Sequence, residues 1–131
     1  MLVVTDERKL RDEFELLLLS PRGYHQTAAE CACYWDTEAA RVWNKADFDL
    51  NEHIALATRW LKTVKRRKTV NPIDTSDDYR HMVEDWCGEF VLHGCFVMAA
   101  LRLGFVVQPM HGDSEARLNI SLKSMPRTWR A

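Results

Sequence analysis

The feature that most constrains the fold is residues 76–122, where two helical patterns separated by glycine lead into an alternating one. The first pattern has apolar residues spaced like one face of a helix: Tyr79, Met82, Val83, Trp86 and Phe90. Gly88 lies inside this run, and a glycine costs about 1 kcal/mol relative to alanine in a helix interior. We therefore expect a break between Gly88 and Leu92, then a second helix from Leu92 to Leu103. Gly104 would cap that helix.

The same stretch is predicted to end in a β-hairpin. Residues 117–122 alternate polar and apolar side chains, as a half-buried strand does, and residues 105–108 supply the other strand. Pro109 and the run 111–114 have the composition of the intervening turn. We expect the hairpin to pack on the helices through Phe105, Leu118, Ile120 and Leu122.

Upstream, three further helices are predicted, and a Thr75–Asp78 pair opens the helix that follows them. The first spans residues 6–19, with Leu10, Phe14, Leu17 and Leu18 on one face. The second spans 28–43, behind a Thr27–Glu30 capping box, and the third runs from the cap Asp49 to about Arg67. The expected fold is one α+β domain of about five helices: a helical part (5–103), a β-hairpin (105–122) and a basic tail (123–131).

Composition narrows the class of protein. The chain has 131 residues, 47% of them apolar, which suits a single globular domain. No apolar run approaches the roughly 20 residues that cross a bilayer, and the N-terminus lacks the basic-then-apolar order of a signal peptide. We therefore expect a cytoplasmic protein with no membrane partner. Because the net charge is -1, any electrostatic partner must meet a local patch.

One such patch is predicted where the third helix ends. Six cations fall within ten residues: Arg59, Lys62, Lys65, Arg66, Arg67 and Lys68. The helix dipole stabilises cations at a C-terminus, but six exceed what that role needs. The tail adds Lys123, Arg127 and Arg130, with an aromatic residue at Trp129. These residues are the predicted contact for a macromolecular partner or for nucleic acid, and Trp129 would also suit self-association, so the oligomeric state stays open.

A local resemblance falls on the run Trp86-Cys87-Gly88-Glu89-Phe90-Val91. It resembles the Trp-Cys-Ala-x-Phe-Val nucleophile segment of CHAP-type cysteine amidases, with glycine in place of alanine. The resemblance implies a thiolate at Cys87, with His111 and Asn119 following in the family's Cys, His, Asn order. Only 44 residues follow Cys87, enough for one hairpin where that fold needs a larger sheet. A cysteine hydrolase is therefore the third-ranked hypothesis.

Neither a metal site nor a cofactor is predicted. Cys31 and Cys33 are one residue apart in a helix, so their side chains point about 200° apart and do not easily share a metal. Cys31 and Cys95 are better explained as buried free thiols. His93 precedes Gly94 near a helix start, which favours a capping or packing role. No glycine-rich phosphate loop is present in the sequence.

The order of the last elements also suggests a nucleic-acid-binding module. Helix, short connection, helix and hairpin is the order of a winged helix-turn-helix, with residues 92–103 as the recognition helix. Such a helix must present polar side chains to base edges, and this one offers little beyond His93 and Arg102. The basic residues would then support only sequence-independent phosphate contacts.

We therefore expect a small non-catalytic protein that binds a protein or nucleoprotein complex, with the winged-helix-like module as the alternative. In general character, and in no single motif, the chain resembles small proteins of bacteriophages and mobile elements. Those include anti-CRISPR-like inhibitors of host defence complexes. The resemblance implies a host complex as partner, met either by acidic side chains that mimic DNA phosphates or by the basic residues.

Overall fold

The structure, a computed structural model, describes residues 7–39 and 49–122. The first part contains α1 (Glu7–Leu16), β1 (Leu19–Ser20), β2 (Gly23–Tyr24), α2 (Ala28–Tyr34) and a π-helical turn, η1 (Trp35–Ala39). The second part contains α4 (Leu50–Leu61), β3 (Lys65–Arg66), α5 (Ser76–Cys87), α6 (His93–Arg102), β4 (Val107–Pro109), β5 (Ala116–Leu118) and β6 (Ile120–Ser121). The fold is α+β and mostly helical, as expected, with short antiparallel strands.

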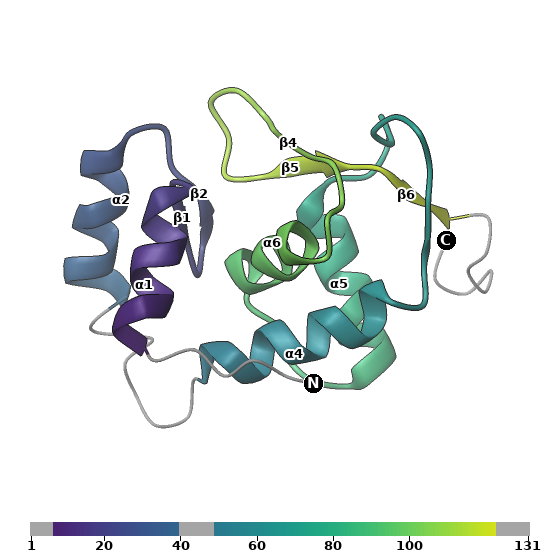
Figure 1. The fold of residues 1–131 in the computed structure, drawn as a ribbon, viewed down its shortest axis with the longest axis horizontal. Helices are drawn as coiled ribbons and strands as arrows, with labels where there is room; N and C mark the ends of the chain where they lie inside the picture. Colours follow the sequence, from purple (N-terminus) through teal and green to yellow (C-terminus); the bar gives the residue numbers. More distant parts are fainter. Residues whose placement is uncertain (1–6, 40–48, 123–131) are drawn as a thin grey trace.

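Helix α6 is the centre of the molecule. It lies between the N-terminal elements on one side and α4 and α5 on the other, with β4 and β5 above it (Figure 1). Every residue from Val91 to Ala100 is buried. Three large rings, one from each of α4, α5 and α6, meet beside it with centroids 6.2–6.4 Å apart: Trp60, Tyr79 and Phe96. A helix that is apolar on all sides has to be enclosed by its neighbours, and this one is.

The predicted caps at Thr27, Asp49 and Thr75 and the predicted break at Gly88 are confirmed, whereas the predicted start of the first helix at residue 6 lies outside the described residues. The side chain of Thr27 accepts from the amide of Glu30 at 3.1 Å, and Asp49 accepts from the amide of Asn51 at 3.0 Å. The Asp78 carboxylate accepts from the Thr75 amide at 2.9 Å. After α5, Gly88 has a φ of 74°, and after α6, Gly104 has a φ of 83°. Both glycines end their helices in the left-handed region, which costs glycine little.

The first helix is shorter than predicted. It ends at Leu16 instead of residue 19, and Leu18 has a φ of 59°. That left-handed residue ends the helical path before β1, where Leu19 pairs with Tyr24 across a small hairpin and lies fully buried. Leu17 and Leu18 are therefore not on the inner face of a helix. Burial of Leu19 offsets the conformational cost of a left-handed leucine.

The second predicted helix changes character before its expected end. It is α-helical to Tyr34 and continues as the π-helical turn of residues 35–39, and its predicted end at Trp43 lies outside the described residues. The buried Trp35 begins this turn and donates from Nε1 to the carbonyl of Leu19 at 3.0 Å. Its ring meets Phe14 edge-on at 5.6 Å, which joins α1, β1 and the second helix in one unit.

The third helix ends at Leu61 and not at Arg67. The carbonyl of Trp60 accepts the hydroxyl of Thr63 at 2.6 Å, which satisfies one of the unpaired groups at the helix end. Extending the helix would also place like charges three and four residues apart, which is unfavourable. Lys65 and Arg66 instead form β3, which pairs with Ser121 and Ile120.

The C-terminal hairpin is confirmed, but its strands have other bounds than predicted. Strand β4 pairs with β5, so that Val107 lies opposite Leu118, but Phe105 precedes the strand instead of beginning it. The predicted second strand divides at Asn119. Its first half pairs with β4, and its second half pairs with β3. The expected packing residues Phe105, Leu118 and Ile120 are buried, and Leu122 packs partly against the core.

Candidate functional site

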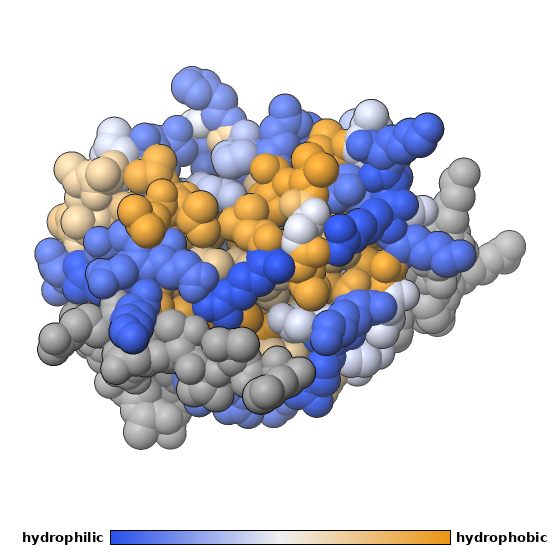
Figure 2. Space-filling view, viewed as in Figure 1, coloured by the Kyte–Doolittle hydropathy of each residue, from blue (hydrophilic) through white to orange (hydrophobic). Residues whose placement is uncertain are grey.

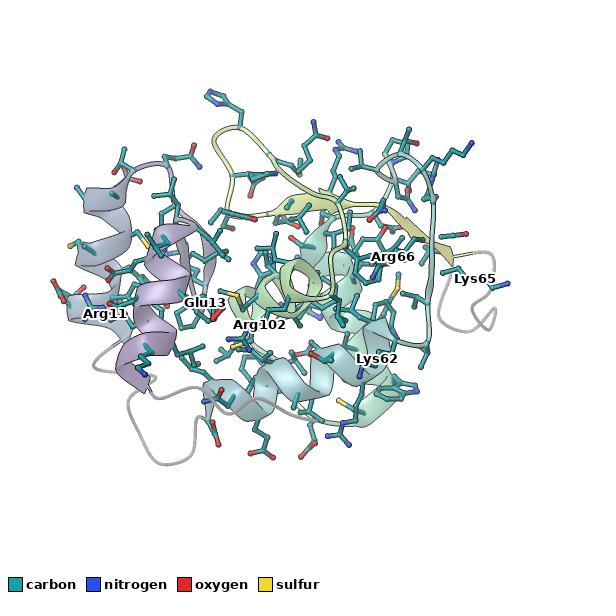
Figure 3. The ribbon with its side chains drawn as sticks, in the orientation of Figure 1. Arg11, Glu13, Lys62, Lys65, Arg66 and Arg102 are labelled. Carbon is teal, nitrogen blue, oxygen red and sulfur yellow. The ribbon has the colours of Figure 1, made fainter. Side chains whose placement is uncertain are left out.

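The predicted basic cluster lies where α4 gives way to β3. Arg59 and Lys62 are on the last turn of α4 and just after it, whereas the other four cations follow in and after β3. All six side chains are exposed. Figure 3 places Lys62, Lys65 and Arg66 together at one end of the molecule, and Figure 2 shows hydrophilic residues gathered over the same end. The end of α4 and the pairing of β3 thus hold six charges that a single helix would have spread around its axis.

Arg66 differs from the other five cations because the fold uses its guanidinium. Nη1 donates to the carbonyl of Gly104 at 3.2 Å, and Nη2 donates to the carbonyl of Leu103. The guanidinium carbon also lies 4.3 Å from the centroid of the Phe105 ring, a cation–π contact. Arg66 therefore satisfies the C-terminal end of α6 and covers a core aromatic. Its charge is committed to the fold.

The remaining five cations form what we call the basic face: Arg59, Lys62, Lys65, Arg67 and Lys68. Within residues 7–39 and 49–122, no carboxylate lies within ion-pair distance of any of their charged groups. Three arginines elsewhere on the molecule are paired. Arg11 contacts Glu15, Arg80 contacts Asp77, and Arg102 contacts Glu13, at 2.6–2.7 Å. The basic face is therefore a local excess of positive charge on a chain of net charge -1.

Strand register fixes the direction of two of these charges. Arg66 lies opposite Ile120, which is buried, and the Arg67 amide donates to the carbonyl of Asn119 at 2.8 Å. Side chains alternate along a strand, so Lys65 points to the opposite side of β3 from Arg66, and the Lys65 and Arg67 side chains are both exposed. Strand β6 ends with Ser121 opposite Lys65.

The predicted tail residues Lys123, Arg127, Trp129 and Arg130 lie outside the described residues. Their contribution is carried by the sequence alone, which adds three cations directly after β6.

The winged-helix arrangement lacks an available recognition helix. Helix α6, which occupies that place in the chain, is enclosed by the core. His93 is 8% exposed, and the guanidinium of Arg102 bonds the carboxylate of Glu13 through two nitrogens, at 3.1 and 2.6 Å (Figure 3). A recognition helix must project into a groove, and α6 has no face with which to do so.

The residues implied by the cysteine-amidase resemblance are not brought together. The Cys87 thiol lies at the C-terminal end of α5, 3.6 Å from the carbonyl of Glu89. His111 is exposed in the β4–β5 loop, which lies beyond the opposite end of α5 (Figure 1). The 12 residues of α5 span about 18 Å. The side-chain amide of Asn119 is used to join strands, because it accepts from the amide of Val106 at 2.8 Å and donates to the carbonyl of Arg67 at 3.0 Å.

His93 takes a structural place that the sequence only hinted at. Its Nδ1 lies 2.8 Å from the carbonyl of Arg22, and because a carbonyl can only accept, Nδ1 carries the proton. Nε2, 2.6 Å from Ser76 Oγ, therefore accepts the serine hydroxyl. Ser76 Oγ in turn accepts from the amide of Ala116 at 2.9 Å. Burial lowers the pKa of His93, which favours this neutral form. The serine is fully buried, so the pair ties three segments together.

A cleft of about 400 Å³ lies beside His93, between the N-terminal elements and α5. Its polar lining includes Arg22, Ser114, Glu115 and the ion pair of Arg80 with Asp77, whose atoms are 2.7 Å apart. Phe90 adds an aromatic wall. No sequence motif predicts this cleft, because its lining residues come from segments far apart along the chain. Its charges of both signs do not single out a class of ligand.

Cys31 and Cys95 are buried free cysteines, and burial raises the pKa of both thiols, in agreement with their predicted packing role. In residues 7–39 and 49–122, no group of three or more metal-ligating side chains is placed to hold a metal ion. Over the same ranges, no helix has the length and apolar character required to cross a membrane.

Comparison of the chain with protein-family models, with curated proteins and with solved structures finds no match. The function is therefore inferred from the chemistry and placement of the described residues.

Proposed function

We propose that the protein is a non-catalytic binding protein and that it contacts an anionic surface of a macromolecular partner through the basic face. One observation carries the proposal. Five exposed cations stand within ten residues of one another and have no ion-pair partner among the described residues, whereas three arginines elsewhere, Arg11, Arg80 and Arg102, are paired. Like charges held together repel one another, so a partner that supplies negative charge gains binding energy there.

The fold supports this proposal by presenting the charges on fixed backbone. Arg59 lies on α4, and Lys65 is held by the pairing of β3 with β6. Two hydrogen bonds join Arg67 to Asn119. The Arg67 amide donates to the Asn119 carbonyl, and the Asn119 side-chain amide donates to the Arg67 carbonyl. Binding therefore orders the lysine and arginine side chains without having to order the chain that carries them.

Retention on immobilised heparin tests the basic face with a generic polyanion. We expect the wild-type protein to bind at low salt, and the combined variant Lys62→Glu, Lys65→Glu, Lys68→Glu to elute at much lower salt. The matched control is Lys9→Glu, because Lys9 is an exposed lysine on α1, away from the basic face. Control and wild type should elute together.

Two results would contradict the proposal. One is a wild-type protein that passes through heparin at low salt. The other is a triple variant that is folded, as judged by circular dichroism, and elutes at the same salt as the Lys9→Glu control.

A further inference from the structure

We infer that the anionic partner of the basic face is the phosphate backbone of nucleic acid, read without regard to base sequence. This inference rests on the proposed function, because it names the partner of the same face. Three features of the described residues favour nucleic acid over an acidic protein surface: the type of cation, the absence of an apolar centre in the basic segment, and the position of α6.

The basic face is rich in lysine, which favours phosphate over protein. Lys62, Lys65 and Lys68 make up three of its five cations. Lysine is depleted in protein–protein interfaces, whereas both lysine and arginine neutralise phosphates and release their counterions. Of the arginines in the segment, the one with bidentate and aromatic contacts is Arg66, and those contacts are internal.

The segment also lacks the apolar centre on which protein partners depend. Binding energy at protein interfaces concentrates in buried aromatic and arginine anchors surrounded by a polar rim. The one aromatic residue in residues 59–72 is Trp60, and it is fully buried in the core. Ile73, directly after this segment, is 82% exposed, and Val106, whose backbone bonds Asn119, is 51% exposed, but neither is an aromatic or arginine anchor. The described basic segment thus has the polar and charged residues of an interface rim but lacks the exposed aromatic anchors of an interface centre.

The arrangement of elements excludes recognition of base sequence by α6, the helix that occupies the place of a recognition helix in the chain. Phosphate contacts position a protein on nucleic acid, and base-edge contacts in a groove specify sequence. Helix α6 is enclosed, so it cannot enter a groove. The exposed cations instead lie at the end of α4 and in and after β3, where they are available to contact phosphates. Binding through this face is therefore expected to depend on salt and not on base sequence.

The number of cations sets the size of the expected salt effect. For duplex DNA, the slope of log affinity against log salt is about -0.9 for each phosphate that a protein neutralises. Five contacts from the basic face would give a slope of about -4.5 by the same relation. Each lysine whose charge is removed should reduce the magnitude of that slope by about 0.9.

The test is fluorescence anisotropy of a labelled DNA duplex between about 50 and 200 mM salt, a range over which phosphate contacts weaken strongly. Two duplexes of unrelated sequence and one labelled poly-glutamate chain serve as probes. The variants are Lys62→Gln, Lys65→Gln and the double variant, with Lys9→Gln as the control. We expect equal affinity for the two duplexes, a smaller salt slope for each basic-face variant, an unchanged slope for the control, and tighter binding of DNA than of poly-glutamate.

The outcomes separate this inference from the proposed function. Lysine-dependent binding of heparin and poly-glutamate without binding of DNA would overturn the nucleic-acid inference and leave the anion-binding face in place. Failure to bind any of the polyanions would overturn both. DNA binding whose salt slope is the same in the double variant and the control would also overturn the inference, as would a tenfold or larger preference for one duplex sequence.

Discussion

At the scale of single residues, close approach between segments decides which substitutions the chain tolerates. Gly94 donates from its amide to the carbonyl of Pro21 at 2.9 Å, at the start of α6. A Cβ atom at Gly94 would lie 1.8 Å from the carbonyl oxygen of Ser20. The sequence places Gly94 near a helix start, but its contact with the N-terminal hairpin is visible only in the folded chain.

Gly94→Ala should therefore destabilise the protein strongly. The clash is with backbone, which cannot rotate away, so we expect a loss of about 3 kcal/mol in the free energy of unfolding, the upper end of overpacking costs. Gly88→Ala is the control, because a Cβ there meets no atom within 4 Å and the cost comes only from a φ of 74°, about 1 kcal/mol. Urea unfolding of both variants measures the difference, and equal losses would contradict this account.

At the scale of elements, the short strand β3 determines what the basic residues do. A helix continued through residues 62–67 would have made all six cations equivalent surface charges. Because the chain instead pairs with β6, Arg66 turns to the end of α6, and its neighbours on either side point outward. Two adjacent arginines, Arg66 and Arg67, therefore have separate roles.

Alanine substitutions of these two arginines should separate stability from binding. Arg66→Ala removes two charged hydrogen bonds to carbonyls and a cation–π contact, and we expect it to lower the free energy of unfolding by about 1–2 kcal/mol. Arg67→Ala removes an exposed side chain and should change stability by less than about 0.5 kcal/mol. On DNA the order should reverse, with Arg67→Ala giving the larger drop in salt slope. A stability loss in Arg67→Ala equal to that in Arg66→Ala would refute the distinction.

At the scale of the whole molecule, the elements of residues 7–39 and those of residues 49–122 meet at the start of α6 (Figure 1). His93 is one of the polar links there, because one ring nitrogen bonds Arg22 and the other bonds Ser76. The acceptor role of Nε2 toward the Ser76 hydroxyl requires the neutral ring, whereas Nδ1 donates to the Arg22 carbonyl. Asp77, Arg80 and Glu115 are the charged groups around it, and burial has the largest effect in lowering the His93 pKa.

Stability should therefore fall in mild acid. Below the ordinary histidine pKa of 6.5, unfolded His93 takes up a proton that the folded protein resists, so the unfolded state binds more protons. The stabilising effect of neutral His93 is complete above pH 6.5 and is lost as the pH falls through the lower folded pKa. Burial also lowers the pKa of His25 and His53, which adds to the same trend.

Urea unfolding between about pH 8 and pH 5 measures this dependence. In His93→Gln the fall in stability should be smaller than in the wild type, because one titrating group has been removed. The control is His81→Gln on the exposed side of α5, where 58% of the histidine side chain is accessible. A His93→Gln variant with the same pH dependence as the control would show that His93 is not responsible.

The sequence by itself determined features that depend on neighbouring residues: the caps at Thr27, Asp49 and Thr75, the break at Gly88, and the apolar faces that form the core. These are local because a cap bonds amides two or three residues away and a helical face repeats every few residues. The sequence also located the cations of the basic face, since their density is a property of the chain.

Only the tertiary structure decided which of those cations are available and where the helices stop. Leu61 ends α4, and Arg66 contacts the C-terminal end of α6, because β6, more than fifty residues later, supplies the pairing partner of β3. His93 and Gly94 acquire their roles from Arg22, Ser20 and Pro21, far earlier in the chain. Cys87, His111 and Asn119 follow one another in a suggestive order, yet the fold separates Cys87 from His111 and occupies Asn119. Order along the chain does not fix distance in space, because distance depends on contacts between segments far apart in sequence.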